Sequence, residues 1–269
     1  MSFDKWQITG TGIVEAKAVL KVHEVSATKA YPYGTLARDC HRNELYRYAK
    51  FGDTVLTNRL AWGFNYQYSP QSAIGTTSAL GADHIHVTIG AHDGEPGSHD
   101  GAIAADELVG GTVVIFHADA SVLVYGITAN TVVASGGGAC TITLDNVLQA
   151  AVTAGVEVVE IMANPYIDIR TGNNGGLRPF LGVPMGPGTA TLCNGWIKRR
   201  GWAFVAPQST VGTSMHGQVV ARHDGSIDSA IGGQGPTDAW TQNMQHIGYV
   251  GTWALAGTQG APFIWLMLE

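Results

Sequence analysis

The C-terminal part of the chain, residues 195–269, is a series of short apolar runs separated by turn residues. The runs are rich in Trp, Tyr, Val, Ile and Phe, which β-strands favour, and they span residues 196–205, 217–223, 246–255 and 261–268. Asp224-Gly225 lies between two apolar stretches and predicts a hairpin, because Gly tolerates the positive φ of a type I′ turn. Since residues 263–268 are all large and apolar, we expect this end of the chain to lie in a β core.

The rest of the chain continues the β pattern. A hairpin around a turn at residues 39–43 is predicted by Leu36, Leu45, Tyr46 and Tyr48. Two further strands are predicted at residues 112–116 and 121–127. Residues 12–25 alternate as a half-buried strand does, although the same letters also have high helix propensity. The sequence therefore predicts an all-β fold, a pair of packed sheets or a barrel-like sandwich. It also predicts one short helix near residues 146–154, followed by Gly155, and long loops at 69–110 and 171–190.

Glycine-rich stretches suggest how this fold is divided. Residues 170–176 and 182–188 are loops that separate the two halves of the chain near residue 190. We expect an N-terminal arm over residues 1–30, a β-rich domain with a histidine-rich loop over 31–190, and a C-terminal β region over 191–269 that packs with the preceding part.

The composition is unusually poor in charge. Only 13% of the residues are charged and 36 are glycine, whereas about 25% charged residues are typical of globular proteins. Such a surface suits a protein that packs against other subunits, and equally a Gly-rich β protein with long turns. The net charge of −6 and the single basic cluster at Lys198-Arg199-Arg200 exclude extensive phosphate contacts, so we expect no direct nucleic-acid binding.

The cysteines and the hydropathy pattern indicate where the protein is made. Cys40, Cys140 and Cys193 are far apart and lack CxxC spacing, which favours reduced thiols in a protein synthesised in the cytoplasm. No apolar run approaches the roughly 18 residues of a membrane span, and residues 1–5 do not begin a signal peptide. We therefore expect no membrane association.

Histidines and aspartates gather in the middle of the sequence. His84 and His86 are two residues apart, so they point to one face of a strand, and His92 and Asp93 follow. His and Asp are metal ligands, which makes these four the candidate metal site. The other interpretation is that His-Asp-Gly triplets mark turns, with a third possibility of histidines at a pH-sensitive subunit contact. We expect turns, and no metal or cofactor.

An alternating aromatic row precedes the histidines. Trp62, Phe64, Tyr66 and Tyr68 would line one face of a strand. Such a row can stack on sugars, but it is more often a core face or a face buried against a neighbouring subunit, so these residues are our candidates for an inter-subunit contact. No nucleophile elbow, phosphate loop or carboxylate pair is apparent, and we expect no enzymatic activity.

Several segments resemble the head decoration, or cement, proteins of tailed bacteriophages. The similar segments include Tyr31-Pro32-Tyr33-Gly34-Thr35, Glu44-Leu45-Tyr46-Arg47-Tyr48, Asn164-Pro165-Tyr166, Asn194-Gly195-Trp196-Ile197-Lys198-Arg199-Arg200 and His246-Ile247-Gly248-Tyr249. The histidine-rich residues 81–100 depart from this pattern. The resemblance implies a structural virion protein on the outer capsid surface, with the major capsid protein as its partner.

Decoration proteins clamp neighbouring capsomers, so the resemblance and the low charge predict a homotrimer whose residues 1–26 reach a neighbouring subunit. Two alternatives remain open at this point. One is a β-sandwich module of a phage that binds glycans or a receptor, and the other is a His/Asp metal-binding enzyme.

Overall fold

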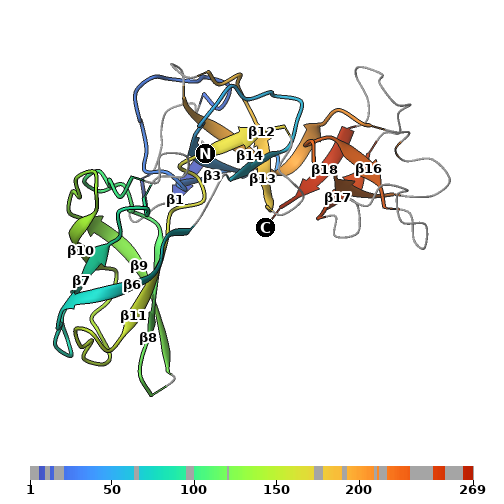
Figure 1. Ribbon diagram of the computed structural model, residues 1–269. Coiled ribbons are helices and arrows are strands. Elements are labelled where there is room, and N and C mark those ends of the chain that lie inside the picture. The colour runs from blue at the N-terminus through green and yellow to red at the C-terminus, as the bar shows by residue number, and fades with distance from the viewer. Residues whose placement is uncertain are drawn as a thin grey trace. The chain divides into compact units, whose positions relative to one another are not determined.

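The chain folds into two compact units (Figure 1). The computed structural model describes residues 6–9, 13–14, 21–63, 67–94, 100–119, 121–172, 178–189, 193–208, 211, 217–230, 245–251 and 263–268. One unit contains residues 65–165, and the other combines residues 1–64 with 166–269. Throughout the described residues the regular elements are strands, so the predicted all-β fold is confirmed.

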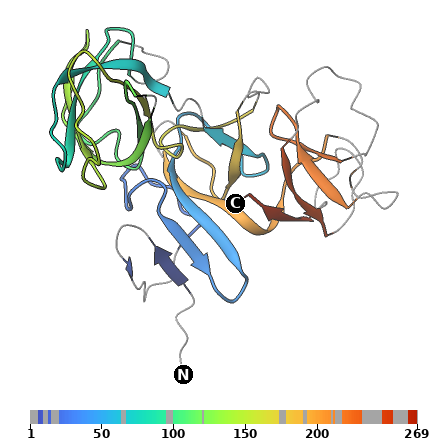
Figure 2. The same cartoon turned by 90° about the horizontal axis from the view of Figure 1, so that it is seen from below.

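Residues 65–165 form a closed antiparallel barrel, seen as a teal-to-green ring in Figure 2. Its strand order is β10-β7-β6-β11-β8-β9, and β9 pairs with β10 to close it. Alternate residues point inward, for example Ile85, Val87 and Ile89, which are buried, while the residues between them face outward. The strands are β6 (Gln67–Thr76), β7 (His84–Ile89), β8 (Thr112–Phe116), β9 (Val122–Asn130), β10 (Gly138–Leu144) and β11 (Val158–Met162).

Two local predictions are wrong in this barrel. Residues 146–154 are not helical: Leu148 and Val152 are buried, and Val152 pairs with Ser78 as an isolated β-bridge. Their i,i+4 spacing fits a helix, but backbone hydrogen bonds to residues 78–82 satisfy the segment in an irregular, non-helical form. The predicted loop at 69–110 contains most of β6 and all of β7, whose outward Thr and His side chains give the segment a loop-like composition.

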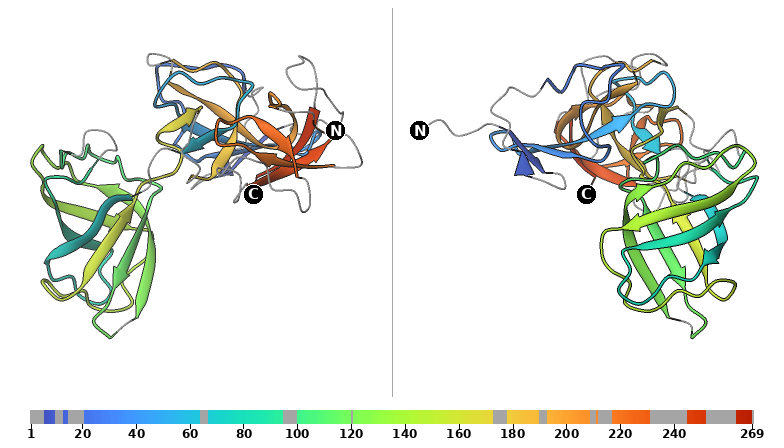
Figure 3. Two further views of the ribbon diagram at one scale, coloured as in Figure 1. Left: turned by 45° about the vertical axis from the view of Figure 1, so that its right-hand side comes forward. Right: turned by 90° about the vertical axis from the view of Figure 1, so that its left-hand side faces the viewer.

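The other unit is built on a twelve-stranded antiparallel sheet (Figure 3). Its main strand order is β16-β15-β17-β18-β14-β4-β3-β1-β2, while β13 pairs with β14 and β5, and β12 pairs with β5. The predicted loop at 171–190 therefore contains a strand, β13. The strands are β1 (Trp6–Thr9), β2 (Ile13–Val14), β3 (Leu36–Asp39), β4 (Glu44–Lys50), β5 (Ala61–Gly63), β12 (Ile169–Thr171), β13 (Phe180–Pro184), β14 (Asn194–Phe204), β15 (Gln218–Ala221), β16 (Ile227–Ser229), β17 (His246–Val250) and β18 (Phe263–Met267).

The predicted hairpins are present in this sheet. β3 and β4 pair around the turn at residues 40–43, with Tyr46 and Tyr48 buried on one face. β15 and β16 pair around Asp224-Gly225. Only Gly225 of that turn has a positive φ, of 76°, so the connection is a type I turn followed by a left-handed glycine rather than the predicted type I′ turn.

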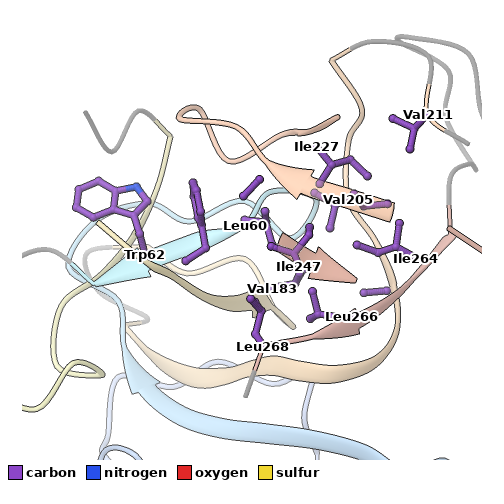
Figure 4. Close-up of a cluster of buried hydrophobic side chains, with 14 residues drawn as sticks. Leu60, Trp62, Val183, Val205, Val211, Ile227, Ile247, Ile264, Leu266 and Leu268 are labelled. Atoms are coloured by element: carbon purple, nitrogen blue, oxygen red, sulfur yellow. The ribbon is translucent and has the colours of Figure 1, made fainter. Parts of the chain in front are cut away.

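One core cluster of this unit combines residues of β14 to β18 with residues of β5 and β13 (Figure 4). Ile264, Leu266 and Leu268 alternate along the last strand and are buried, so this end of the chain packs in the core as predicted. The cluster also includes Leu60, Trp62, Phe180, Val183, Ala203, Val205, Val211, Val219, Ala221, Ile227 and Ile247.

The N-terminal strands belong to the same sheet. β1 pairs with β3 of its own chain, and β2 pairs with β1. Within the predicted strand at 12–25, residues 13–14 form β2, and a hydrogen bond from Glu24 N–H to the Lys21 carbonyl closes a turn. β5 precedes the barrel residues in the sequence, and its partners β12 and β13 follow them. The two units therefore divide at residues 64/65 and 165/166, rather than near residues 30 and 190.

Candidate functional site

The two histidines of β7 lie together on the outside of the barrel. His84 and His86 flank the buried Ile85, and their ring centroids are 5.1 Å apart with an interplanar angle of 74°. His84 Nδ1 is 2.8 Å from Asp83 Oδ1, and His86 Nδ1 is 3.0 Å from Thr141 Oγ1 on β10. The sequence-based expectation that both side chains share one strand face is therefore confirmed.

His92 and Asp93 belong to the turn that follows β7. Asp93 Oδ2 accepts a hydrogen bond of 2.7 Å from the Gly90 N–H, and the Gly101 N–H donates to the Asp93 carbonyl at 2.9 Å. His92 is exposed. Asp93 thus shapes the turn in the way that Asp typically does. Within the described part of the chain, no group of three or more His, Cys, Asp or Glu side chains could hold a metal ion.

The structure separates the predicted aromatic row. Trp62 lies in β5 and is only 4% exposed, within the core of its own unit. Its indole N–H donates to the Gly172 carbonyl at 3.2 Å, and the Arg178 guanidinium lies 4.8 Å from its ring centroid. Tyr68 lies in β6 of the barrel, so the two residues occupy different strands in different units. Phe64 and Tyr66 lie outside the described residues, as does the Tyr68 side chain.

A different set of aromatic residues is exposed, on the outer face of β14, β17 and β18. Phe263, Trp265 and Met267 alternate with the buried Ile264 and Leu266, so they point away from the core. Trp202 and Phe204 do the same on β14, on either side of the buried Ala203. We call the following six residues the aromatic face: Trp202, Phe204, Tyr249, Phe263, Trp265 and Met267.

The aromatic face is ordered in rows across the strands. Trp265 lies opposite Trp202 on one side and Tyr249 on the other, and Phe204 lies opposite Phe263. The Trp202 and Trp265 ring centroids are 5.3 Å apart, edge to face, and those of Phe204 and Phe263 are 6.5 Å apart. Such cross-strand aromatic pairs stabilise a sheet by up to about 1 kcal/mol each, so the face is a rigid surface.

The aromatic face remains open to solvent although it is apolar. Trp202 is 50% exposed, Phe263 45%, Tyr249 44% and Met267 43%. Its margin is polar: Gln218 lies opposite Tyr249, and Arg200 lies opposite Met267. An apolar centre with a polar rim is the usual anatomy of a protein–protein interface, and contiguous exposed apolar side chains mark interaction surfaces.

The backbone near β17 is shaped to hold this face. A Cβ added to Gly251 would meet the Trp202 ring at 2.1 Å, so the indole lies directly over this glycine. Gly248 has a φ of +154°, and a Cβ there would meet the Trp265 carbonyl oxygen at 2.0 Å. Position 248 therefore requires glycine, because an added Cβ there would meet backbone, whereas a side chain at position 251 would have to displace the Trp202 ring.

The aromatic face was missed in the sequence analysis, although its residues fall in predicted strands. The run Phe263-Ile264-Trp265-Leu266-Met267 is apolar on both alternating faces, whereas a strand with one solvent-facing side alternates with polar residues. In the sequence analysis this continuous run is interpreted only as core. A strand that is apolar on both sides, however, has one side packed in the core and a second side that is either covered by another apolar surface or exposed to solvent.

No protein family, curated protein or solved structure matches this chain. Among the residues described here, no helix is long and apolar enough to cross a membrane.

Proposed function

We propose that this protein is a structural, non-enzymatic component that docks onto another protein through the aromatic face. The observation that carries the proposal is the set of six large side chains on one sheet face, of which four are exposed and two are partly buried. Trp, Tyr, Phe, Met and Arg are enriched in protein interfaces, and Trp and Tyr dominate their binding energy. The face contains four of these residue types, with Arg200 at its margin.

The assembly we propose is the head of a tailed phage. The resemblance of residues 31–52 and 194–203 to decoration proteins supports this choice, as does a chain with only 13% charged residues. In this proposal the protein is a homotrimer in the virion, on the outer capsid surface, and the aromatic face covers an apolar patch of the major capsid protein. It neither binds nucleic acid nor inserts into a membrane.

The test is co-sedimentation of the purified protein with capsid shells that lack it. Trp202→Ala and Phe263→Ala each remove an exposed ring, and we expect each to weaken binding about 30-fold, which corresponds to a hot-spot loss of about 2 kcal/mol. Leu80→Ala is a matched control, because Leu80 is also exposed and apolar but lies in the barrel unit. If both ring variants decorate shells as the control does, the aromatic face is not the docking surface.

The homotrimer is tested separately by sedimentation equilibrium of the free protein and of a variant without residues 1–26. In this structure β1 pairs with β3 of its own chain, and exchange of this strand between chains would use the same register. A wild-type protein that remains monomeric at high concentration would exclude the trimer while leaving the docking surface untouched.

A second function is favoured by one observation, the exposed indole of Trp202 beside Trp265. Exposed aromatic rings also stack on sugars, so a glycan-binding module is the alternative. A glycan array followed by tryptophan-fluorescence titration decides between them. Saturable binding to an oligosaccharide that is lost in Trp202→Ala, without shell binding, would favour the glycan.

A further inference from the structure

We propose that His84 and His86 form a two-imidazole site for a divalent transition-metal ion of the zinc, nickel and copper class. This site lies on the outer surface of the barrel unit and shares no residue with the aromatic face. Both side chains project from the outside of β7, on either side of the buried Ile85. A strand sets such a pair at fixed spacing, because residues i and i+2 share a face.

The hydrogen bonds of the first ring leave its other nitrogen available for a metal. The Asp83 carboxylate can only accept, so the 2.8 Å contact requires that His84 Nδ1 carries the hydrogen. Nε2 then has the free lone pair. A ligating histidine in metalloproteins usually donates its second ring N–H to a carboxylate in this way, which fixes the tautomer and the ring orientation.

The second ring has a comparable arrangement. His86 Nδ1 lies 3.0 Å from the hydroxyl of Thr141, the residue directly opposite it on β10. A hydroxyl can accept as well as donate, so it can hold the hydrogen on Nδ1 when Nε2 binds an ion. Both rings are therefore held by oxygen partners at Nδ1.

The distance between the rings suits one shared ion. A zinc ion bound about 2.0–2.1 Å from a ring nitrogen lies roughly 3.2 Å from the centre of that ring. Two centroids 5.1 Å apart are at a separation that allows one ion to bind both rings, with an angle at the ion close to the tetrahedral value. Imidazole ligands favour zinc, copper and nickel over magnesium and calcium. Since the described residues offer no third ligand of the His, Cys, Asp or Glu type, water or a ligand from another molecule completes the coordination.

The test is isothermal titration of the full-length protein with ZnCl2, with MgCl2 for comparison. We expect one zinc ion per chain and no magnesium binding. His84→Gln or His86→Gln should abolish this isotherm, and Asp83→Asn should weaken it about tenfold, since outer-shell partners typically contribute this much. His92→Gln is the matched control, because it removes an exposed imidazole from the same unit.

Copper gives a second readout. Electron paramagnetic resonance of the Cu2+-loaded protein should show two nitrogen ligands in the wild type and one in either single variant. Circular dichroism checks that each variant remains folded, which we expect because both rings are partly exposed. If the single variants bind Zn2+ as tightly as His92→Gln does, or if Mg2+ binds equally well, the proposal is wrong.

Discussion

Lys198 and Glu44 form a buried ion pair between β14 and β4, with 3.0 Å between Nζ and Oε1. Their side chains are only 8% and 6% exposed. The ammonium group also donates to the Trp202 carbonyl at 2.9 Å, and the Tyr46 hydroxyl donates to Glu44 Oε2. Each charged group therefore has two hydrogen-bond partners, and the pair joins the strand that carries the aromatic face to its neighbour.

Breaking this pair should destabilise the unit strongly. Lys198→Met leaves the Glu44 carboxylate buried without its counter-charge, and Glu44→Gln does the same to the Lys198 ammonium. We expect either substitution to lower the free energy of unfolding by about 3–5 kcal/mol. The double variant should lose less than the sum, because no uncompensated charge remains. Guanidinium unfolding followed by tryptophan fluorescence measures this, since all seven tryptophans lie outside residues 65–165. Strictly additive losses would contradict the coupling.

The barrel should fold without the rest of the chain. Its hydrogen-bonded ring is closed, and Gln67 and Met162, near its two ends, are register partners on β6 and β11. We expect a fragment of residues 65–165 to show β-type circular dichroism and a cooperative thermal transition. The tyrosine fluorescence of the fragment, to which the buried Tyr125 contributes together with Tyr66 and Tyr68, reports on the same transition. A fragment without a transition would mean that the barrel depends on the other unit.

One partly buried and one buried tyrosine predict a loss of stability at alkaline pH. Burial, with smaller contributions from Cys193 and Tyr48, raises the pKa of Tyr33 to about 12, and burial together with the Glu44 hydrogen bond raises the pKa of Tyr46 further. In the unfolded chain tyrosine ionises near pH 10. The stability that these groups contribute is therefore fully present below about pH 10 and is lost as the pH rises toward 12.

Chemical unfolding at a series of pH values measures this effect, together with the ultraviolet absorbance of the phenolate. The expected result is a free energy of unfolding that falls above about pH 10, with a smaller fall in Tyr46→Phe, which has no phenol to ionise. An equal fall in the variant and the wild type would assign the effect to other groups.

The cysteines should differ in reactivity. Cys140 is 1% exposed inside the barrel, and burial raises the pKa of its thiol, whereas Cys40 is exposed. Because the thiolate is the reactive form, iodoacetamide should label Cys40 in the native protein and Cys140 only after unfolding. Mass spectrometry of the digested protein locates the label. Rapid native labelling of Cys140 would show that the barrel opens readily.

The parts of this fold that local sequence could predict are those made by residues close together in the chain. The hairpin from Leu36 to Lys50 and the turn at Asp224-Gly225 follow from short alternating runs joined by turn residues, and both are present. The shared face of His84 and His86 was predictable for the same reason, since a period of two needs only the strand itself. The all-β class follows from the number of such segments.

Other features depend on partners that are distant in sequence. Leu148 and Val152 have helical spacing, but backbone hydrogen bonds to residues 78–82 keep the segment from forming a helix. These long-range hydrogen bonds, together with burial, outweigh the weak local preference for helix. The division into two units follows from the pairing of β5 with β12 and β13, which no local pattern records. Trp62 is apolar and aromatic like Trp202, yet the first is buried and the second exposed. Only the tertiary packing decides this, because burial depends on which strands cover each face.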